Sequence, residues 1–338
     1  VLWVGGEDGI EGEIISRQKI DYQAIPAAGL HGVGLRNLPG NLALLLRGYL
    51  KARQIIREFK PDVLLFTGGY LAVPAAFAGR LVPSLVYIPD IEPGLAIKTI
   101  ANLAASIAVS VGQTRLYTPA GKPIMVSGYP VRLKMLSWTR EKAFKSLELD
   151  PTIQVLLVFG GSKGARSINR ALNNILPDLL KDMQVVHITG TLDWDEIKEN
   201  VKSLTEMEQR NYRVYPFLHD EMGAALRSAD LVVSRSGASV LGEYPMFSLP
   251  AILVPYPHAW RYQKTNAEYL ARQNAAEIIE DAALSEKLLD TVQSLMRNPE
   301  RLALMSSAMK SLAQPEAAEK IARQLFELAG IDPGGESI

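Results

Sequence analysis

Cysteine is missing from this chain of 338 residues, and so is any excess of one charge. Without cysteine there is no disulfide and no thiolate metal ligand. Lys and Arg together number 36, and Asp and Glu together number 36, which gives a formal net charge of zero. This balance argues against a protein that coats a polyanion, so we expect no nucleic-acid partner.

Long apolar runs are also missing. No stretch approaches the roughly 18 consecutive apolar residues that cross a bilayer, and the apolar stretch 71–78 is interrupted by Pro74. No secretory signal is visible either. The sequence begins at Val1 inside a run that is typical of a strand, so we expect that residues before Val1 are missing.

Short apolar runs alternate with longer amphipathic segments along most of the chain. Such runs occur at 62–67, 84–88, 154–159, 184–189 and 230–234, each before a stretch with helical periodicity. Fully apolar strands that alternate with helices are typical of parallel sheets covered on both faces. The sequence therefore predicts an α/β fold, and its length predicts about two domains.

The boundary between the domains is predicted just after Arg132. Residues 128–132 are rich in turn formers, and 139–147 has the pattern of a helix that leads into a new series of strands. We expect a first domain of residues 1–132 and a second of residues 133–330, with a cleft between them. The last helical pattern covers residues 316–328.

The first informative motif is Gly160-Gly161-Ser162-Lys163-Gly164-Ala165, which follows an apolar run and precedes a helical pattern. Glycines allow a tight turn, and a helix start offers unpaired N–H groups and the positive end of its dipole, which suit a phosphate. The spacing is neither that of a P-loop nor that of a dinucleotide fingerprint. A tight turn without a ligand explains the motif equally well.

The second motif runs from Ser234 to Glu243. A strand is predicted to end at Ser234 and a helix to start near Ala238, so the free N–H groups at 238–241 suit a diphosphate. Glu243 is predicted further along the same helix, where a carboxylate accepts hydrogen bonds from both hydroxyls of a ribose. The alternative for Glu243 is a solvated helix residue.

The third motif covers residues 254–267, where a strand end with two prolines precedes a helical pattern. Gln263 and Asn266 are three residues apart and share a helix face. Amide groups donate and accept hydrogen bonds, which suits the neutral hydroxyls of a sugar. A polar helix face without a ligand explains the same pattern.

Together and in this order, the three motifs resemble the MurG family of glycosyltransferases (family 28) of bacterial peptidoglycan synthesis. The likeness extends to Gly68-Gly69-Tyr70, Pro93-Gly94-Leu95 and Gly128-Tyr129-Pro130-Val131-Arg132, and covers nearly the whole chain. The resemblance implies a GT-B architecture, in which two Rossmann-like domains with parallel sheets face each other across a cleft. The first domain would bind a lipid-linked acceptor, the second the UDP-sugar, and the helix 316–328 would return to the first domain.

Carried over residue by residue, the resemblance also implies where the nucleotide-sugar binds. Glu243 would take the ribose hydroxyls, and Leu218 would present its backbone to the uracil. Gln263 and Asn266 would hold the hydroxyls of N-acetylglucosamine (GlcNAc). The other implied substrate contacts are Arg132, Ser162, Ala238, Ser239, Val240, Leu241, Gly242 and Tyr262.

The chain departs from the family at several positions. The family opens with the loop Gly-Gly-Thr-Gly-Gly-His, which supplies part of the acceptor site and the general base. No such loop occurs here, so we expect the first βα unit to lie before Val1. Where the family has His-Glu-Gln-Asn, this chain has Tyr87-Ile88-Pro89-Asp90; a paired Gln-Gln becomes Tyr262-Gln263, and an Asn becomes Tyr129. These changes leave the donor assignment intact, but they leave the acceptor and the base open.

The implied reaction is an inverting single displacement. The C4 hydroxyl of the undecaprenyl-diphosphate-linked muramoyl-pentapeptide (lipid I) attacks the GlcNAc of UDP-GlcNAc, and UDP leaves. Asp90, at the predicted carboxyl end of a strand, is the candidate for the general base. The helix N-termini at Ala165 and Ala238, with Arg132, would stabilise the leaving diphosphate. Because no Asp-x-Asp signature is suitably placed, we expect no metal and no cofactor. Since the histidine loop is missing, we expect this chain alone to be impaired in catalysis.

A basic amphipathic helix is predicted at 41–59, where Leu42, Leu45 and Leu46 stand among Arg47 and Lys51. Such a helix binds anionic lipid, although a helix that packs its apolar side on a sheet has the same pattern. With the resemblance, this predicts a peripheral enzyme on the cytoplasmic face of the bacterial cell membrane. Its expected partners are UDP-GlcNAc, the undecaprenyl-linked acceptor and the membrane surface.

Other functions fit parts of the same pattern. The chain could be another UDP-sugar transferase with a lipid acceptor, or a UDP-sugar-binding module without turnover. A UDP-GlcNAc 2-epimerase would need several carboxylates in the cleft, which the sequence does not show. Binding of UDP-GlcNAc without transfer would favour the binding module.

Overall fold

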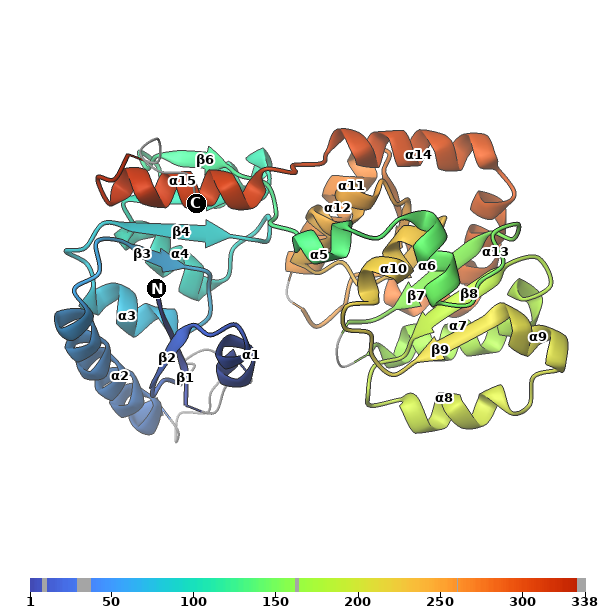
Figure 1. The fold of residues 1–338 in the computed structure, drawn as a ribbon, viewed down its shortest axis with the longest axis horizontal. Helices are drawn as coiled ribbons and strands as arrows, with labels where there is room; N and C mark the ends of the chain where they lie inside the picture. Colours follow the sequence, from blue (N-terminus) through green and yellow to red (C-terminus); the bar gives the residue numbers. More distant parts are fainter. Residues whose placement is uncertain (8–10, 29–37, 162–163, 260, 333–338) are drawn as a thin grey trace. The chain divides into compact units, whose positions relative to one another are not determined.

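The computed structural model describes residues 1–7, 11–28, 38–161, 164–259 and 261–332. They divide into two units (Figure 1). Unit 1 consists of residues 1–127 together with the segment that starts at Glu319, and unit 2 consists of residues 128–318. Every strand pairing among the described residues is parallel, which confirms the predicted α/β class.

Unit 1 contains a four-stranded sheet in the order β3-β4-β5-β6 and a separate pair, β1-β2. Its strands are β1 (Leu2–Gly6), β2 (Asp21–Ile25), β3 (Leu64–Phe66), β4 (Ser84–Ile88), β5 (Ser106–Val109) and β6 (Ile124–Val126). Its helices are α1 (Glu11–Arg17), α2 (Leu38–Phe59), α3 (Ala72–Ala78), α4 (Leu95–Leu103), the 3-10 helix η1 (Gly112–Tyr117) and α15 (Ala317–Leu328).

Helices cover both faces of the four-stranded sheet because β4 alternates its side chains between two apolar layers. Val86 and Ile88 pack in a cluster with residues of α3 and α4. Leu85 and Tyr87 point the other way and pack with Ile321 of α15. The residues Leu325 and Leu328 extend the same apolar face of α15, so this helix covers its side of the sheet along most of its length.

Unit 2 contains one six-stranded sheet in the order β12-β11-β10-β7-β8-β9. Its strands are β7 (Val155–Phe159), β8 (Gln184–Ile188), β9 (Tyr212–Tyr215), β10 (Leu231–Ser234), β11 (Ala251–Leu253) and β12 (Ala276–Ile278). Its helices are α5 (Leu133–Leu136), α6 (Arg140–Ser146), α7 (Arg166–Leu179), α8 (Trp194–Val201), α9 (Glu206–Asn211), α10 (Met222–Ser228), η2 (Ala238–Leu241), α11 (Glu243–Phe247), α12 (Tyr262–Arg272), η3 (Asp281–Ala283), α13 (Leu284–Met296) and α14 (Pro299–Ser311).

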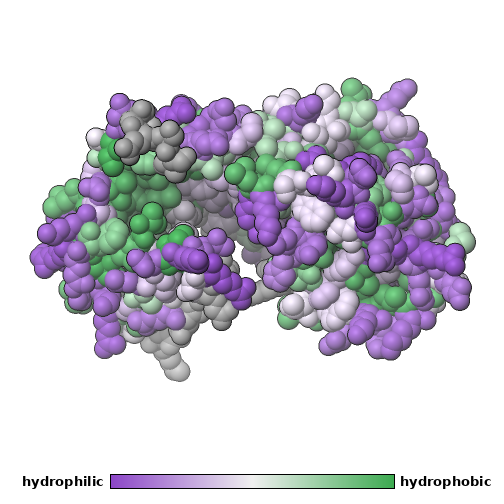
Figure 2. All heavy atoms as spheres, viewed as in Figure 1, coloured by the Kyte–Doolittle hydropathy of each residue, from purple (hydrophilic) through white to green (hydrophobic). Residues whose placement is uncertain are grey.

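The core of unit 2 follows from helical and strand periodicity. Ile168, Leu172, Leu176 and Leu179 of α7 are buried at spacings of three or four residues, so they form one face. This face packs with strand residues and with α13 in one cluster. Local signals also fix helix starts, such as the capping box of α9, in which the Thr205 hydroxyl accepts from the Glu208 N–H. The surface of both units carries polar and apolar side chains, and on unit 1 apolar side chains gather on the face seen in Figure 2.

Candidate functional site

The carboxyl edge of the unit 2 sheet gathers the loops that carry the predicted nucleotide-sugar residues. The strand order reverses between β7 and β10, because β8 and β9 follow on one side of β7 and β11 and β12 on the side of β10. In open α/β sheets, ligands bind at the carboxyl ends of strands next to such a reversal. The candidate site is therefore built from the loops after β7, β9, β10 and β11.

The loop after β7 turns tightly into α7. Gly161 and Gly164 have φ angles of +94° and +82°, which favour glycine. A Cβ atom at Gly164 would lie 2.1 Å from the carbonyl oxygen of Thr189, so only glycine lets the loop pass this backbone. The loop ends at the N-terminus of a helix of 14 residues, whose first N–H groups carry partial positive charge. The predicted contact Ser162 lies outside the described residues.

The loop after β10 forms two short helical segments where the sequence predicted one helix. Ala238–Leu241 is a single 3-10 turn, and α11 begins after it at Glu243. Two residues explain the break: Gly242 leaves helical geometry at φ −129°, and Pro245 lacks the N–H that a continuous helix needs. The expectation that Glu243 lies further along the same helix is therefore wrong. Glu243 is instead the first residue of a new helix.

The 3-10 turn also changes which backbone groups are free. The Val240 N–H donates to the Gly237 carbonyl oxygen at 3.1 Å, so it is not free as predicted. The side chains of Val240 and Leu241 are buried. Within the described part of the chain, the N–H groups of Ala238 and Ser239 make no hydrogen bond. These two amides are the ones this loop offers to an anion.

Glu243 is half-buried and lies near two other predicted contacts. The Ser239 side chain hydrogen-bonds to its carboxylate, and Arg132 is close enough for its charge to act on it. Burial has the largest effect and raises the pKa of Glu243, whereas the Ser239 hydrogen bond and the Arg132 charge lower it. Tyr129 packs on the same loop, because a Cβ at Gly242 would lie 2.5 Å from the Tyr129 Cβ. The structure thus brings Arg132, Ser239 and Glu243 together.

The first turns of α12 place Gln263 and Asn266 differently. The Gln263 Oε1 accepts from the Tyr256 N–H at 2.9 Å, while its Nε2 makes no hydrogen bond to any described residue. Asn266 is fully buried, and its Nδ2 donates to the Ser236 carbonyl oxygen at 3.1 Å. Tyr262, the first residue of α12, is half-buried. Of the predicted pair, Gln263 keeps a donor for a ligand, and Asn266 braces the turn before η2.

Leu218 follows β9 at the same edge of the sheet. It is half-buried between Phe217 and His219, whose rings contact each other edge-on at 4.8 Å. Across the described ranges, the backbone N–H and carbonyl of Leu218 make no hydrogen bond. A uracil needs such a pair of backbone groups, since its edge both donates and accepts.

Arg235 connects these loops, although no pattern in the sequence singles it out. Its Nη1 pairs with Asp281 Oδ1 at 2.5 Å and donates to the Val254 carbonyl oxygen at 3.2 Å. Its Nη2 donates to Ser167 Oγ at 2.8 Å, and its guanidinium lies 5.1 Å from the centre of the Tyr256 ring. One side chain, only 11% exposed, thus joins the first turn of α7 to the ends of β10 and β11 and to η3. An arginine inside a glycine-rich motif is usually solvated, so only the tertiary structure reveals this role.

A buried network lies behind the same loops, with His187 of β8 at its centre. Asn169 Nδ2 donates to Asp193 Oδ2 at 2.8 Å, so Asn169 Oδ1 is the acceptor for His187 Nε2 at 2.9 Å. His187 Nδ1 therefore accepts from the Tyr212 hydroxyl at 2.7 Å. Arg166, the first residue of α7, closes the network with a 2.9 Å contact from its Nε to Asp193 Oδ1. Burial holds His187 neutral and lowers its pKa to about 3.

Acid is expected to destabilise the fold through His187. Its pKa is about 3 in the folded chain and about 6.5 in the unfolded chain, so only the unfolded chain binds a proton between these values. The contribution is complete above pH 6.5 and is lost as the pH falls, by about 2 kcal/mol between pH 7 and pH 5. Urea unfolding followed by circular dichroism at both pH values measures it. The variant His187→Gln is expected to lack this share of the pH dependence, and an equal pH dependence in both proteins would contradict the assignment.

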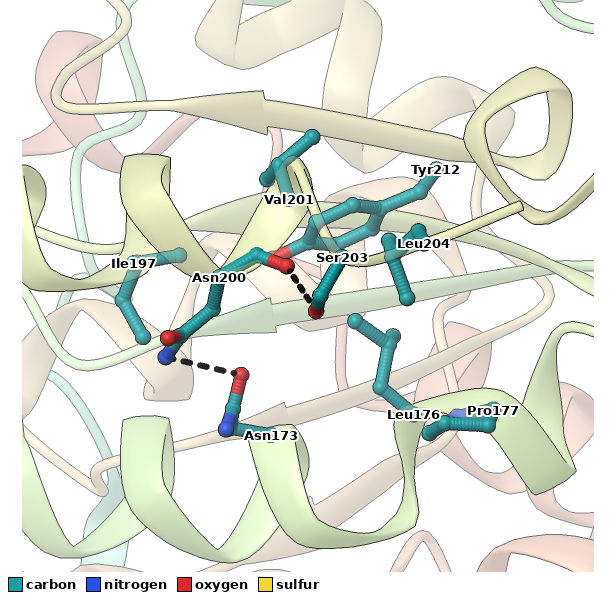
Figure 3. Close-up of a pocket in the computed structure, with 9 residues that line it drawn as sticks. All are labelled: Asn173, Leu176, Pro177, Ile197, Asn200, Val201, Ser203, Leu204 and Tyr212. Carbon is teal, nitrogen blue, oxygen red and sulfur yellow. Dashed lines mark hydrogen bonds between the residues drawn. The ribbon is translucent and has the colours of Figure 1, made fainter. Parts of the chain in front are cut away.

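A small cavity of about 130 Å³ lies beside this network, next to Tyr212 (Figure 3). Polar groups that line it hydrogen-bond to each other. Asn200 Nδ2 donates to Asn173 Oδ1 at 3.3 Å, and Ser203 Oγ donates to the Asn200 carbonyl oxygen at 2.7 Å. A nucleotide-sugar needs several hundred Å³. The cavity is therefore too small to be the donor site.

The carboxyl edge of the unit 1 sheet carries Asp90, the candidate base. Asp90 follows β4 and is half-buried. Nearby, the Tyr87 hydroxyl shares a 2.7 Å hydrogen bond with Ser110 Oγ, which follows β5. Glu92 is only 4% exposed and lies 3.9 Å from Lys98 Nζ. Sequence reasoning missed Glu92, because a single glutamate in a loop forms no pattern.

The fold and the candidate site define the class of this protein. It has two units of parallel strands and covering helices, and one of them joins a reversed strand order to glycine-rich loops suited to a diphosphate. This is the architecture of GT-B glycosyltransferases. The crystal structure of MurG from Acinetobacter baumannii shares the fold, with a TM-score of 0.73 and 24% identity over 97% of this chain and 91% of that chain.

Sequence comparison identifies the family. The models of the glycosyltransferase family 28 N-terminal and C-terminal domains match residues 1–109 and 155–321. A UDP-N-acetylglucosamine–N-acetylmuramyl-(pentapeptide) pyrophosphoryl-undecaprenol N-acetylglucosamine transferase from Roseiflexus sp. is 36% identical over 95% of this chain and 82% of its own length. A transferase of the same name from Desulforudis audaxviator is 37% identical over 98% of this chain and 90% of its own length. The chain belongs to glycosyltransferase family 28.

Proposed function

We infer that this chain transfers GlcNAc from UDP-GlcNAc to the C4 hydroxyl of lipid I, the undecaprenyl-diphosphate-linked muramoyl-pentapeptide, and so makes lipid II. The observation that carries this inference is an identity of 36% and 37% with two transferases of that reaction, over 95% and 98% of the chain. The carboxyl edge of the unit 2 sheet supports it, because its loops offer the groups that a UDP-sugar needs.

The donor is proposed to bind along that edge. The N-terminus of α7 and the free amides of Ala238 and Ser239 hold the diphosphate, and Arg132 adds a positive charge. Glu243 accepts from the ribose hydroxyls, and the backbone of Leu218 faces the uracil. In the same proposal, Gln263 donates its free Nε2–H to a sugar hydroxyl, Ser162 contacts the nucleotide-sugar, and Asn266 acts by bracing the turn.

The chemistry is proposed to be a single displacement that inverts the anomeric carbon. The acceptor oxygen forms the new bond to that carbon as the bond to the diphosphate breaks, and UDP leaves with the electron pair. Asp90 is the proposed base for the proton of the acceptor hydroxyl. The N-terminus of α7 and the free amides of Ala238 and Ser239 stabilise the charge that develops on the diphosphate.

An activity assay tests the proposed function. The full chain is incubated with UDP-GlcNAc carrying radiolabelled GlcNAc and with lipid I in detergent, and the lipid fraction is separated by chromatography. Transfer of label to lipid I, with one UDP released per transfer, is the expected result, at a reduced rate because the histidine loop is missing from this sequence. Binding of UDP-GlcNAc without transfer would contradict the inference and favour a nucleotide-sugar-binding module. UDP release that needs no lipid I would also contradict it.

The outer face of α2 supports contact with a membrane surface. Ala52 and Ile55 point into the core with β2. Leu42, Leu46 and Leu50 lie on another face and are 61%, 60% and 55% exposed. Exposed basic residues adjoin these leucines, among them Arg47, Lys51, Arg53 and Arg57. An exposed apolar stripe beside basic side chains suits an anionic lipid surface. We therefore propose that the chain binds peripherally to the cytoplasmic face of the cell membrane, and that it does not bind nucleic acid.

Among the helices in the described ranges, none has the length and apolar character of a membrane span.

Replacing Leu46 with serine is expected to weaken binding to anionic vesicles about fivefold, because one leucine contributes about 1 kcal/mol when it enters lipid. Flotation with vesicles of phosphatidylglycerol and phosphatidylcholine measures the bound fraction. Leu304→Ser is the matched control, since Leu304 lies on α14 and is 66% exposed. Equal flotation of the two variants, or equal binding to vesicles of phosphatidylcholine alone, would count against the proposal.

A further inference from the structure

A groove opens at the amino edge of the unit 2 sheet, on the side opposite to the candidate donor site. Gln154, Asp230 and Pro250 line it, and they directly precede β7, β10 and β11. Five residues of β7 at about 3.3 Å each put this edge roughly 16 Å from the carboxyl edge. The groove has a volume of about 590 Å³, which is the size of a small-molecule site.

Arg227 of α10 is held rigidly in this groove. Its Nε donates to the Trp138 carbonyl oxygen at 3.1 Å. Its guanidinium lies 4.6 Å from the centre of the Phe247 ring, which is a cation–π contact. The N–H groups on its two Nη atoms make no hydrogen bond within the described residues, and no described carboxylate pairs with them. A fixed, two-pronged donor thus remains without an acceptor.

The other charges of the groove cancel. Arg140 Nη2 and Asp230 Oδ1 form an ion pair at 2.7 Å. Asp230 Oδ2 also accepts the Val155 N–H at 2.8 Å, so this carboxylate is satisfied. Burial lowers the pKa of Arg227, but an arginine stays protonated at neutral pH. The groove therefore keeps the positive charge of Arg227.

From this geometry we propose that the groove binds a small organic anion, a carboxylate or phosphate attached to a planar or branched apolar group. The free Nη atoms of Arg227 match the two oxygens of such a head group in a bidentate pair. Trp138, Pro250 and Leu302 provide apolar walls for the body of the ligand. This site is separate from the donor site, since it lies at the other edge of the sheet.

Isothermal titration calorimetry with the full chain tests the proposal, with benzoate as the probe and benzamide as its neutral isostere. Benzoate is expected to bind saturably at one site per chain, and benzamide at least tenfold more weakly. Phenyl phosphate, titrated in parallel, shows which anionic head group binds more tightly. Arg227→Met is expected to weaken benzoate binding at least tenfold.

Arg210→Met is the matched control, because it removes an exposed guanidinium from α9 and changes the charge equally. This variant is expected to bind benzoate like the unaltered chain. Arg227→Lys keeps the charge but not the two-pronged donor, so its affinity is expected to be intermediate; it supplies the measurement if Arg227→Met fails to fold. Equal affinity for benzoate and benzamide, unchanged binding in Arg227→Met, or no saturable binding of either anion would overturn the proposal.

Discussion

The substitution Glu243→Ala is expected to weaken the affinity for UDP by roughly 30- to 150-fold. A hydrogen bond to a charged group contributes about 1.5–3 kcal/mol. Because Glu243 is only half-buried, water can partly replace its carboxylate, and loss of the pair is expected to cost about 2–3 kcal/mol. Glu243 suits this role because it lies beside Arg132 and Ser239 at the carboxyl edge of the sheet. Isothermal titration with UDP measures the change.

A comparison with 2′-deoxy-UDP makes this experiment specific. The unaltered chain is expected to bind UDP more tightly than 2′-deoxy-UDP, and Glu243→Ala is expected to bind both about equally, because the partner of the 2′-hydroxyl is gone. Glu286→Ala, at an exposed position in the first turn of α13, is the control and is expected to leave both affinities unchanged. If Glu243→Ala still preferred UDP to the same degree, Glu243 would not hold the ribose.

The second large effect is expected at Arg235. Replacing it with methionine removes the charged partner of the Asp281 carboxylate, which is 22% exposed and, among the described residues, keeps only the Ser167 hydroxyl as a donor. We expect a loss of about 3 kcal/mol, at the lower end of the cost of breaking a buried pair. The loss also removes the hydrogen bonds to Ser167 and to the end of β11. Urea unfolding followed by circular dichroism measures the change in the free energy of unfolding.

Two further variants separate the ion pair from simple loss of an arginine. Arg272→Met breaks an exposed pair with Glu268, whose atoms are 3.0 Å apart, and is expected to cost less than about 1 kcal/mol. The double variant Arg235→Met with Asp281→Asn is expected to be more stable than Arg235→Met alone, because no unpaired charge is left in this partly buried position. Equal losses in Arg235→Met and Arg272→Met would show that the loops do not depend on this contact.

The sequence predicted most of the central strands, because a strand buried on both faces forms a continuous apolar run. The apolar runs at 84–88, 154–159 and 184–189 become β4, β7 and β8, all inner strands whose residues are almost entirely buried. No strand was predicted at β2, β5, β6 or β12. Of these, β5 is an inner strand of four buried residues, whereas β6 and β12 are edge strands of only three residues. A short edge strand has one neighbour and a partly exposed pattern, so it leaves no continuous apolar run.

The site was predictable in its segments but not in its details. Glycines at strand ends mark the loops after β7 and β10, because tight turns and close backbone approach leave a compositional trace. The break at Gly242 was missed, since helical periodicity continues across it. Arg235 and Asp281 are 46 residues apart, and neither has a local reason to meet the other. Contacts of this kind come from the tertiary fold alone.

The path of the backbone between the units has a practical consequence for dissecting the protein. The segments before Gly128 and after Ala318 both belong to unit 1, so unit 2 is one unbroken insertion within it. A gene fragment for residues 128–318 would encode the complete core of unit 2. A fragment that stops at Ser127 would lack α15, so Leu85, Tyr87 and Ala108, which pack against this helix, would be exposed to solvent. Truncation from the C-terminus therefore damages the N-terminal unit first.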